Sequence, residues 1–268
     1  MRTVHQSPHA LAMLDESGIA TLQLTNAGTL NIIGTPAITD LRAALQALAR
    51  QPDLRVLVMR GSGDLAFIGG ADIGEMVGLT PATAATFISH LAGLCDAVAA
   101  MPVPVIARLS GWCLGGGLEV ALACDLRLCD AGARFGMPEV KVGIPSVIHA
   151  ALLPRLIGQA HATAMLLCCD NIDATQAAAW GLVHERCAVG ELDAAVQHRA
   201  AALAALPPQA LRQQKRLLRH WQTVPLAQAI TDSVQEFAAA YASGEPQQLM
   251  GEFMARKMSR VRIPPTRS

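Results

Sequence analysis

The sequence predicts an α/β fold, in which a core of alternating strands and helices is followed by a region that is almost entirely helical. Short apolar strands alternate with amphipathic helices up to about residue 190, and the connections between them are short. Beyond that point the apolar residues recur at helical spacing. With 268 residues, of which 52% are hydrophobic, the chain can bury a substantial core.

The first half of the chain contains the expected strands. Ile19–Leu24 alternates in the manner of a strand. Thr35 followed by Pro36 is typical of an N-cap with proline at the first helical position, and leucines recur on one face of the helix to about residue 50. The other elements expected here are strands at 55–59, 105–107 and 126–128, helices at 81–100 and 118–124, and a glycine-rich turn at 111–117.

The second half is expected to be helical from about Pro145. Helices are expected at 146–157, 159–168, 174–180, 191–206, 208–221, 226–242 and 246–259, with 182–183 as the one late strand. The composition shift near Gly190 divides the chain into a core at 1–190 and a helical C-terminal region at 191–268.

Composition argues against several classes of function. Lys plus Arg and Asp plus Glu both number 21, and only 3% of residues are aromatic, so neither nucleic acid nor an anionic membrane is an expected partner. No signal peptide or membrane-spanning apolar run is evident. The seven cysteines show no CxxC spacing, so we expect free thiols in the cytoplasm and no metal site.

Two glycine-rich stretches are the most informative feature of the sequence. Residues 66–72 read AFIGGAD, and residues 115–119 read GGGLE. Each lies where a strand is expected to lead into a helix, so backbone N–H groups are free and no bulky side chain covers them. Two such turns that meet can direct two N–H donors at a developing oxyanion. The alternative is that the small residues only allow close packing of a helix on a strand.

Two acids, Glu119 and Glu139, accompany these turns. Glu119 falls in the first turn of the expected helix, and Glu139 follows the turn Gly136-Met137-Pro138. Together with the glycine turns they indicate acid–base chemistry on a polarised carbonyl. Taken singly, each has a simpler explanation, since Glu119 can stabilise the helix dipole and Glu139 can be a surface turn residue.

The motifs, in this order and spacing, resemble the crotonase (enoyl-CoA hydratase/isomerase) superfamily. The resemblance extends from about Gly18 to Lys257 and is strongest in the two glycine stretches. The other matching segments are Cys124-Asp125-Leu126-Arg127, residues 135–139 (FGMPE) and residues 178–183 (AAWGLV).

The resemblance implies a fold of stacked ββα turns that assembles as a trimer or a dimer of trimers. It implies binding of acyl-CoA, with the thioester oxygen held by the N–H groups of Ala71 and Gly116. Glu119 and Glu139 match the two glutamates with which hydratases add water to a trans-2-enoyl thioester, Glu119 as base and Glu139 as proton donor. No separate cofactor is expected, because coenzyme A is part of the substrate.

The resemblance also implies further substrate contacts and shows two departures. The contact residues are Gly70, Ile73, Gly115, Pro138, Ser146, His149, Arg256 and Lys257. Hydratases usually carry a glycine-rich segment after the second glutamate, whereas this chain has larger residues at 146–149 (SVIH). Residues 26–28, near the expected CoA entrance, read NAG where many relatives have Asn-Arg-Pro.

Three functions remain open from the sequence. The first is hydration of an enoyl-CoA, which uses both glutamates. The second is another crotonase-type reaction, such as isomerisation or thioester hydrolysis, which uses one carboxylate. The third is a non-catalytic protein that binds a CoA ester. The presence of both acids and both glycine turns favours the first.

Overall fold

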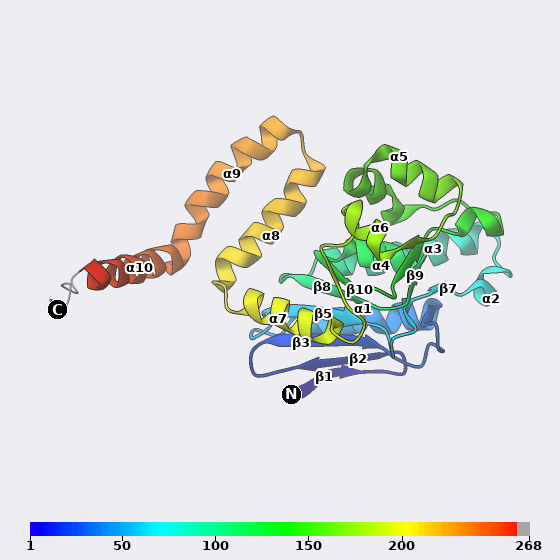
Figure 1. Ribbon diagram of the computed structural model, residues 1–268, viewed down its shortest axis with the longest axis horizontal. Helices are drawn as coiled ribbons and strands as arrows, with labels where there is room; N and C mark the ends of the chain where they lie inside the picture. Colours follow the sequence, from blue (N-terminus) through cyan, green and yellow to red (C-terminus); the bar gives the residue numbers. More distant parts are fainter. Residues whose placement is uncertain (262–268) are drawn as a thin grey trace. The chain divides into compact units, whose positions relative to one another are not determined.

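The computed structural model describes residues 1–261, and the chain divides into two compact units, Met1–Ala205 and Leu206–Ser268 (Figure 1). The first unit is built on a seven-stranded sheet in the order β1-β2-β3-β5-β8-β10-β13. The strands are β1 Arg2–Gln6, β2 Ala10–Leu14, β3 Ile19–Leu24, β5 Val56–Arg60, β8 Val105–Leu109, β10 Leu126–Asp130 and β13 Glu185–Cys187. The first two pairings are antiparallel, and the rest are parallel.

A second, smaller sheet runs in the order β12-β11-β9-β6, and a two-stranded ladder joins β4 to β7. These strands are β4 Ile32–Ile33, β6 Ala66–Ile68, β7 Gly70–Ala71, β9 Trp112–Leu114, β11 Arg134–Gly136 and β12 Ile172–Asp173. Successive chain segments give one strand to the large sheet and the next to the small sheet, as β5 and β6, β8 and β9, and β10 and β11 do. This repeat is the stacked ββα arrangement that the sequence resemblance implies.

The helices of the first unit are α1 Thr35–Ala49, α2 Ile73–Met76, α3 Pro81–Ala99, α4 Gly116–Ala123, α5 Leu153–Leu167, α6 Ala174–Ala179 and α7 Leu192–Ala204. Two short 3₁₀ helices, η1 Glu139–Val142 and η2 Ile148–Leu152, precede α5. In the buried core, α1 packs on α3 and α3 packs on α4. Alternate residues of the parallel strands face the opposite side of the large sheet from this core. There Val56, Val58 and Ile106 pack with Leu192 and Val196 of α7.

The structure differs from the sequence expectations at several boundaries. Helix α7 packs on the large sheet (Figure 1), so the first unit extends to Ala205 rather than to residue 190. The second half contains two strands, β12 and β13, and Leu182 and Val183 are buried in the turn between α6 and β13. The N-cap of α1 is Gly34 instead of Thr35. The sequence expectations contain neither β1 and β2 nor the short strands β4, β6, β7, β9, β11 and β12, and 146–157 begins as the 3₁₀ helix η2.

Helix α3 is, among the described residues, the one helix long and apolar enough to cross a membrane. Length and composition alone give that result. Its Phe87, Leu91, Leu94, Cys95 and Val98 are buried within the first unit, against α1 and α4. This apolar face therefore belongs to the core of the unit.

The second unit consists of α8 Pro208–Thr223, α9 Leu226–Ala240, the 3₁₀ helix η3 Tyr241–Ser243 and α10 Glu245–Val261. Hydrogen bonds join α8 to α9, including one from Trp221 Nε1 to Ser233 Oγ at 3.1 Å and one between His220 Nε2 and Asp232 Oδ2 at 2.6 Å. Many large apolar side chains of this unit are exposed, among them Leu226, Ile230, Val234, Phe237 and Phe253. A unit of this kind presents apolar surface that it cannot cover itself.

Candidate active site

Three consecutive glycines bring the start of α4 against its neighbours. Gly115, the N-cap, has φ +51°, a conformation that favours glycine. Leu91 of α3 and the backbone oxygen of Ile68 in β6 occupy the space that side chains at Gly116 and Gly117 would need. Gly116 is the first residue of α4, so its N–H has no acceptor within the helix. The sequence therefore places an available backbone donor at a closely packed helix start.

Glu119 lies one turn along α4 and is only 3% exposed. Its Oε1 accepts the N–H of Ala150 from η2 at 3.1 Å. Burial raises the pKa of Glu119 to about 8, the Ala150 hydrogen bond lowers it, and the negative charge of Glu139 raises it further. At neutral pH this carboxyl group therefore mostly holds a proton, which is unusual for a glutamate and typical of catalytic acids.

Glu139, at the start of η1, lies next to Gly115, the N-cap of α4. A side chain at Gly115 would come within 2.5 Å of Glu139 Oε1 and 3.9 Å of Pro138 Cδ. The other carboxylate oxygen, Oε2, accepts the hydroxyl of Ser146 at 2.8 Å. Only glycine at position 115 allows this approach, so the same residue shapes the helix start and admits the second carboxylate.

The other glycine turn leads into β7, which pairs in parallel with β4. Asp72 donates its N–H to Ile33 O on β4 at 3.0 Å. Neighbouring N–H groups of an extended strand point to opposite sides, so the N–H of Ala71 faces away from β4. Gly70 has φ +133°, and β7 contacts α4. The structure thus brings the two glycine turns together.

The segment 146–150 connects the two carboxylates, because Ser146 bonds Glu139 and Ala150 bonds Glu119. Between them, Ile148 has φ +40°, a left-handed conformation that costs a β-branched residue about 1–3 kcal/mol. Sequence reasoning missed Ala150, because a backbone donor leaves no side-chain signature. The strain at Ile148 occurs within the segment where this chain departs from the glycine-rich family pattern.

The remaining predicted contact residues lie on η2, α2 and α10. His149 Nε2 lies 3.8 Å from Asp96 Oδ1 on α3, and burial lowers the pKa of His149 while Asp96 raises it. Ile73, the first residue of α2, is 61% exposed. Arg256 and Lys257 are exposed on α10 of the second unit, so a role for them in binding CoA stays a prediction.

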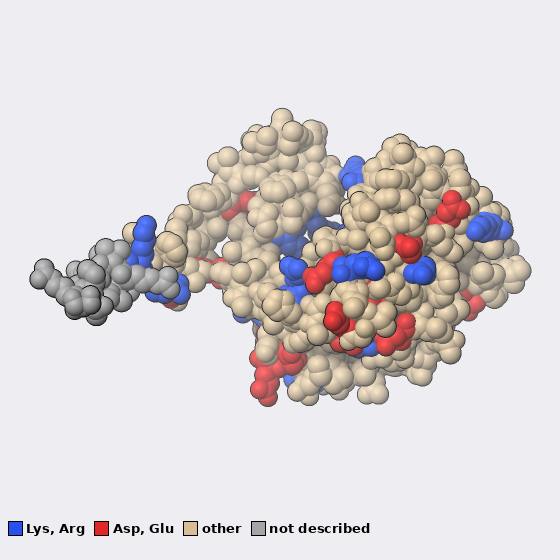
Figure 2. Space-filling model, viewed as in Figure 1, with Lys and Arg blue, Asp and Glu red and all other residues tan. Residues whose placement is uncertain are grey.

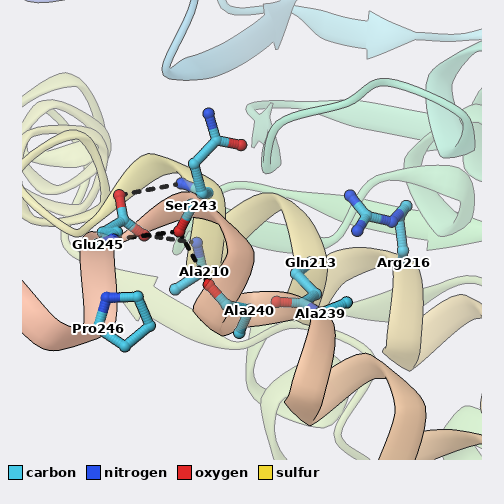
Figure 3. A pocket seen from close by; sticks show the side chains of 9 residues that line it. Ala210, Gln213, Arg216, Ala239, Ala240, Ser243, Glu245 and Pro246 are labelled. Carbon is cyan, nitrogen blue, oxygen red and sulfur yellow. Dashed lines mark hydrogen bonds between the residues drawn. The ribbon is translucent and has the colours of Figure 1, made fainter.

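Each unit contains a cavity. One, of about 270 Å³, is lined by residues of the first unit that include Asn26, Ala27, Gly34 and Asp72, and so adjoins the Ala71 turn. The other, of about 130 Å³, lies between α8, α9 and α10, where Glu245 accepts the N–H of Ala210 at 3.0 Å (Figure 3). None of the predicted site residues is in the lining of either cavity, although Asp72 of the first directly follows Ala71.

On the face seen in Figure 2, basic and acidic side chains are interspersed, in keeping with a net charge of zero. Within the part of the chain that the structure describes, no group of three or more His, Cys, Asp or Glu residues could hold a metal ion. The groups that the structure brings together are two carboxyl groups, the Ser146 hydroxyl and backbone donors, a set suited to proton transfer.

Comparison with known proteins places these features in context. The sequence profile of the enoyl-CoA hydratase/isomerase family matches residues 15–259. A crotonyl-CoA hydratase of Syntrophomonas wolfei is 30% identical over 90% of this chain and 94% of its own length. Mitochondrial enoyl-CoA hydratase domain-containing protein 2 of Mus musculus is 36% identical over 70% of this chain, and the match spans only 64% of that protein. The crystal structure of an enoyl-CoA hydratase from Bacillus anthracis superposes with a TM-score of 0.88 at 25% identity, covering 92% of this chain and 96% of that one.

The raised pKa of Glu119 predicts how stability depends on pH. Below the ordinary value of 4.5 both folded and unfolded chains hold this proton, whereas between 4.5 and about 8 only the folded chain does. The folded state then binds more protons, so its stability falls as pH rises through this window, by at most about 1.4 kcal/mol per pH unit. Urea unfolding at a series of pH values should show this decline, and Glu119→Gln should remove it. Parallel curves for the two proteins would contradict the assignment.

Proposed function

This chain belongs to the enoyl-CoA hydratase/isomerase family, and we propose that it adds water across the double bond of a trans-2-enoyl-CoA thioester. The observation that carries the proposal is the pair of carboxyl groups, Glu119 and Glu139, which the segment 146–150 holds beside the start of α4. A single carboxylate is enough to move a proton between two carbons. Adding water requires one group to take a proton from water and one to give a proton to carbon.

In the proposed reaction, the thioester oxygen accepts the N–H groups of Ala71 and Gly116. This polarises the conjugated double bond and stabilises the negative charge that develops on oxygen as water attacks the β-carbon. The water oxygen forms the new C–O bond, one proton passes to a carboxylate, and the π electrons move into the enolate. A proton from the second carboxyl group then forms the C–H bond at the α-carbon. Return of the first proton to that carboxyl group, through solvent, completes the cycle.

The protonation of Glu119 favours a particular division of roles. With a pKa of about 8, Glu119 starts with the proton and gives it to the α-carbon. Its Oε1 accepts the N–H of Ala150, which leaves Oε2 to carry that proton. Glu139 then receives the proton from water on Oε1, since Oε2 accepts the Ser146 hydroxyl. This division is the reverse of the one that the family resemblance implies.

We propose that the cavity beside the Ala71 turn receives part of the coenzyme A portion of the substrate. It is lined by Asn26 and Ala27, where the chain departs from the Asn-Arg-Pro of many relatives, and by Asp72, which directly follows Ala71. No further cofactor is needed for the proposed reaction, because the substrate itself carries the activated thioester.

We also propose that the chain assembles as a trimer or a dimer of trimers. The support is the exposed apolar surface of the second unit, where Leu226, Val234 and Phe237 are each at least 65% exposed. Light scattering at micromolar concentration should then return three or six times the 28.1 kDa mass of the chain. A mass of one chain would refute this part of the proposal.

Hydration of crotonyl-CoA tests the reaction, followed as the loss of absorbance of the enoyl thioester. Glu119→Gln and Glu139→Gln keep the side-chain shape, and each should lower turnover about 10²–10⁴-fold because each removes an acid or a base. Ser146→Ala leaves both glutamates in place and frees Glu139 Oε2, so we expect a loss of about tenfold, equivalent to one hydrogen bond.

The controls separate chemistry from binding. Glu185→Gln changes a partly exposed glutamate on β13 that pairs with Arg199, and it should turn over as the unchanged protein does. Calorimetric binding of butyryl-CoA, a saturated thioester that cannot be hydrated, should be nearly the same for every variant. Near-full activity in Glu139→Gln would reject hydration by two carboxyl groups in favour of a one-carboxylate reaction.

A further inference from the structure

The turn that carries Ala71 has few packing contacts of its own. Strand β7 is only two residues long, and the helix that follows it, α2, has four residues and no buried side chain. Ile73 is 61% exposed and Val77 is 85% exposed, while Met76 is partly buried against the core. Only Ala71 and Met76 of residues 70–77 pack against the core, so the position of this segment depends largely on polar contacts, among them the bond from the Asp72 N–H to Ile33 O at 3.0 Å.

Glu75, in the middle of α2, provides such a contact. Its Oε2 accepts the backbone N–H of Thr35 at 2.8 Å, and its Oε1 accepts the Thr35 hydroxyl. Thr35 is the first residue of α1, a 15-residue helix with six buried side chains. Both oxygens of one carboxylate thus join a weakly packed segment to a firmly packed helix.

The start of α1 is adapted to receive this carboxylate. The N-cap residue of α1 is Gly34, which has no side chain to cap the helix, and the first turn contains no acid. A side chain at Gly34 would come within 2.7 Å of Glu75 Oε2. Helix N-termini favour a negative charge, because their first N–H groups lack acceptors. Glu75 supplies that charge from another element of the fold.

A short chain of contacts leads from Glu75 back to Ala71. Asp72 Oδ1 accepts the N–H groups of Gly74 at 2.8 Å and Glu75 at 3.3 Å, which fixes α2 to the end of β7. Ala71 immediately precedes Asp72. Asp72 therefore links Ala71 to Glu75, and its own N–H, which Ile33 O accepts at 3.0 Å, is a second attachment of this turn to β4, the strand just before α1.

We infer that Glu75 and Thr35 form a clamp that positions the N–H of Ala71 for catalysis. Glu75 is a positioning residue, since it acts through the Ala71 turn and not on the substrate. The inference rests on the proposed function, in which Ala71 is one of the two oxyanion donors. The competing explanation is that Glu75 only caps α1 and contributes stability.

A matched pair of substitutions at Thr35 separates these explanations. Thr35→Val has nearly the same shape and keeps the backbone N–H but removes the hydroxyl, whereas Thr35→Ser keeps both donors. If the clamp positions Ala71, Thr35→Val should lower kcat for crotonyl-CoA about tenfold, with the dissociation constant of butyryl-CoA within twofold of the unchanged protein. Thr35→Ser should keep the kcat of the unchanged protein. Glu75→Gln, which removes the charge from the other side, should resemble Thr35→Val.

Amide hydrogen exchange of the free protein gives a readout that does not depend on the reaction. Residues 70–76 should exchange faster in Thr35→Val and Glu75→Gln than in Thr35→Ser, while residues 38–48 of α1 stay equally protected. Unchanged kcat and unchanged exchange at 70–76 in both variants would overturn the inference, as would faster exchange confined to α1. Failure of the unchanged protein to hydrate crotonyl-CoA would instead reject the proposed function and leave the exchange result as the test of the clamp.

Discussion

The close approach permitted by Gly115, Gly116 and Gly117 is the constraint on which the site depends. At Gly115 a side chain would collide with Glu139, and at Gly117 one would overlap the backbone of β6. The start of α4 can therefore lie against the small sheet, with a Gly116 N–H that has no acceptor within the helix and with the Glu139 carboxylate next to Gly115. Three glycines weaken a helix start, a cost that makes sense where the backbone itself must be approached.

Burial of Glu119 follows from this packing. Every residue of α4 is buried, so a carboxyl group one turn from the glycines is removed from water. Its charged form is disfavoured by desolvation and by the nearby Glu139, while the single N–H of Ala150 compensates only in part. The tightly packed start of α4 thus provides both a backbone hydrogen-bond donor, Gly116, and an acid that holds its proton, Glu119, within one helical turn.

The segment 146–150 connects the two carboxyl groups of the site. One end holds Glu139 through Ser146, the other holds Glu119 through Ala150, and Ile148 between them is in a strained conformation. Strain of this kind persists only where surrounding contacts determine the backbone. Because this segment contacts both carboxyl groups and departs from the glycine-rich pattern of hydratases, it is the first place to look for differences in substrate from other family members.

The glycine stretches could be singled out from the sequence because glycines are a costly choice at a helix start, and the two glutamates could be singled out because they accompany those stretches. The break at Gly158, with φ +78°, was likewise visible as the gap between two expected helices. Features set by tertiary contact could not be found in this way. The N–H of Ala150 has no side-chain signature, and Glu75 resembles any surface helix acid until the fold brings Thr35 to it. Helix α7 was assigned to the C-terminal region because nothing local shows that Leu192 and Val196 face the sheet.

The most direct test of the account is a crystal structure of the Glu119→Gln, Glu139→Gln double variant with crotonyl-CoA bound, since this protein should bind the substrate without converting it. The account predicts the thioester oxygen roughly 2.7–3.1 Å from the backbone nitrogens of both Ala71 and Gly116, with the double bond beside residues 119 and 139. A thioester oxygen out of reach of either nitrogen, or a double bond remote from the two side chains, would contradict it.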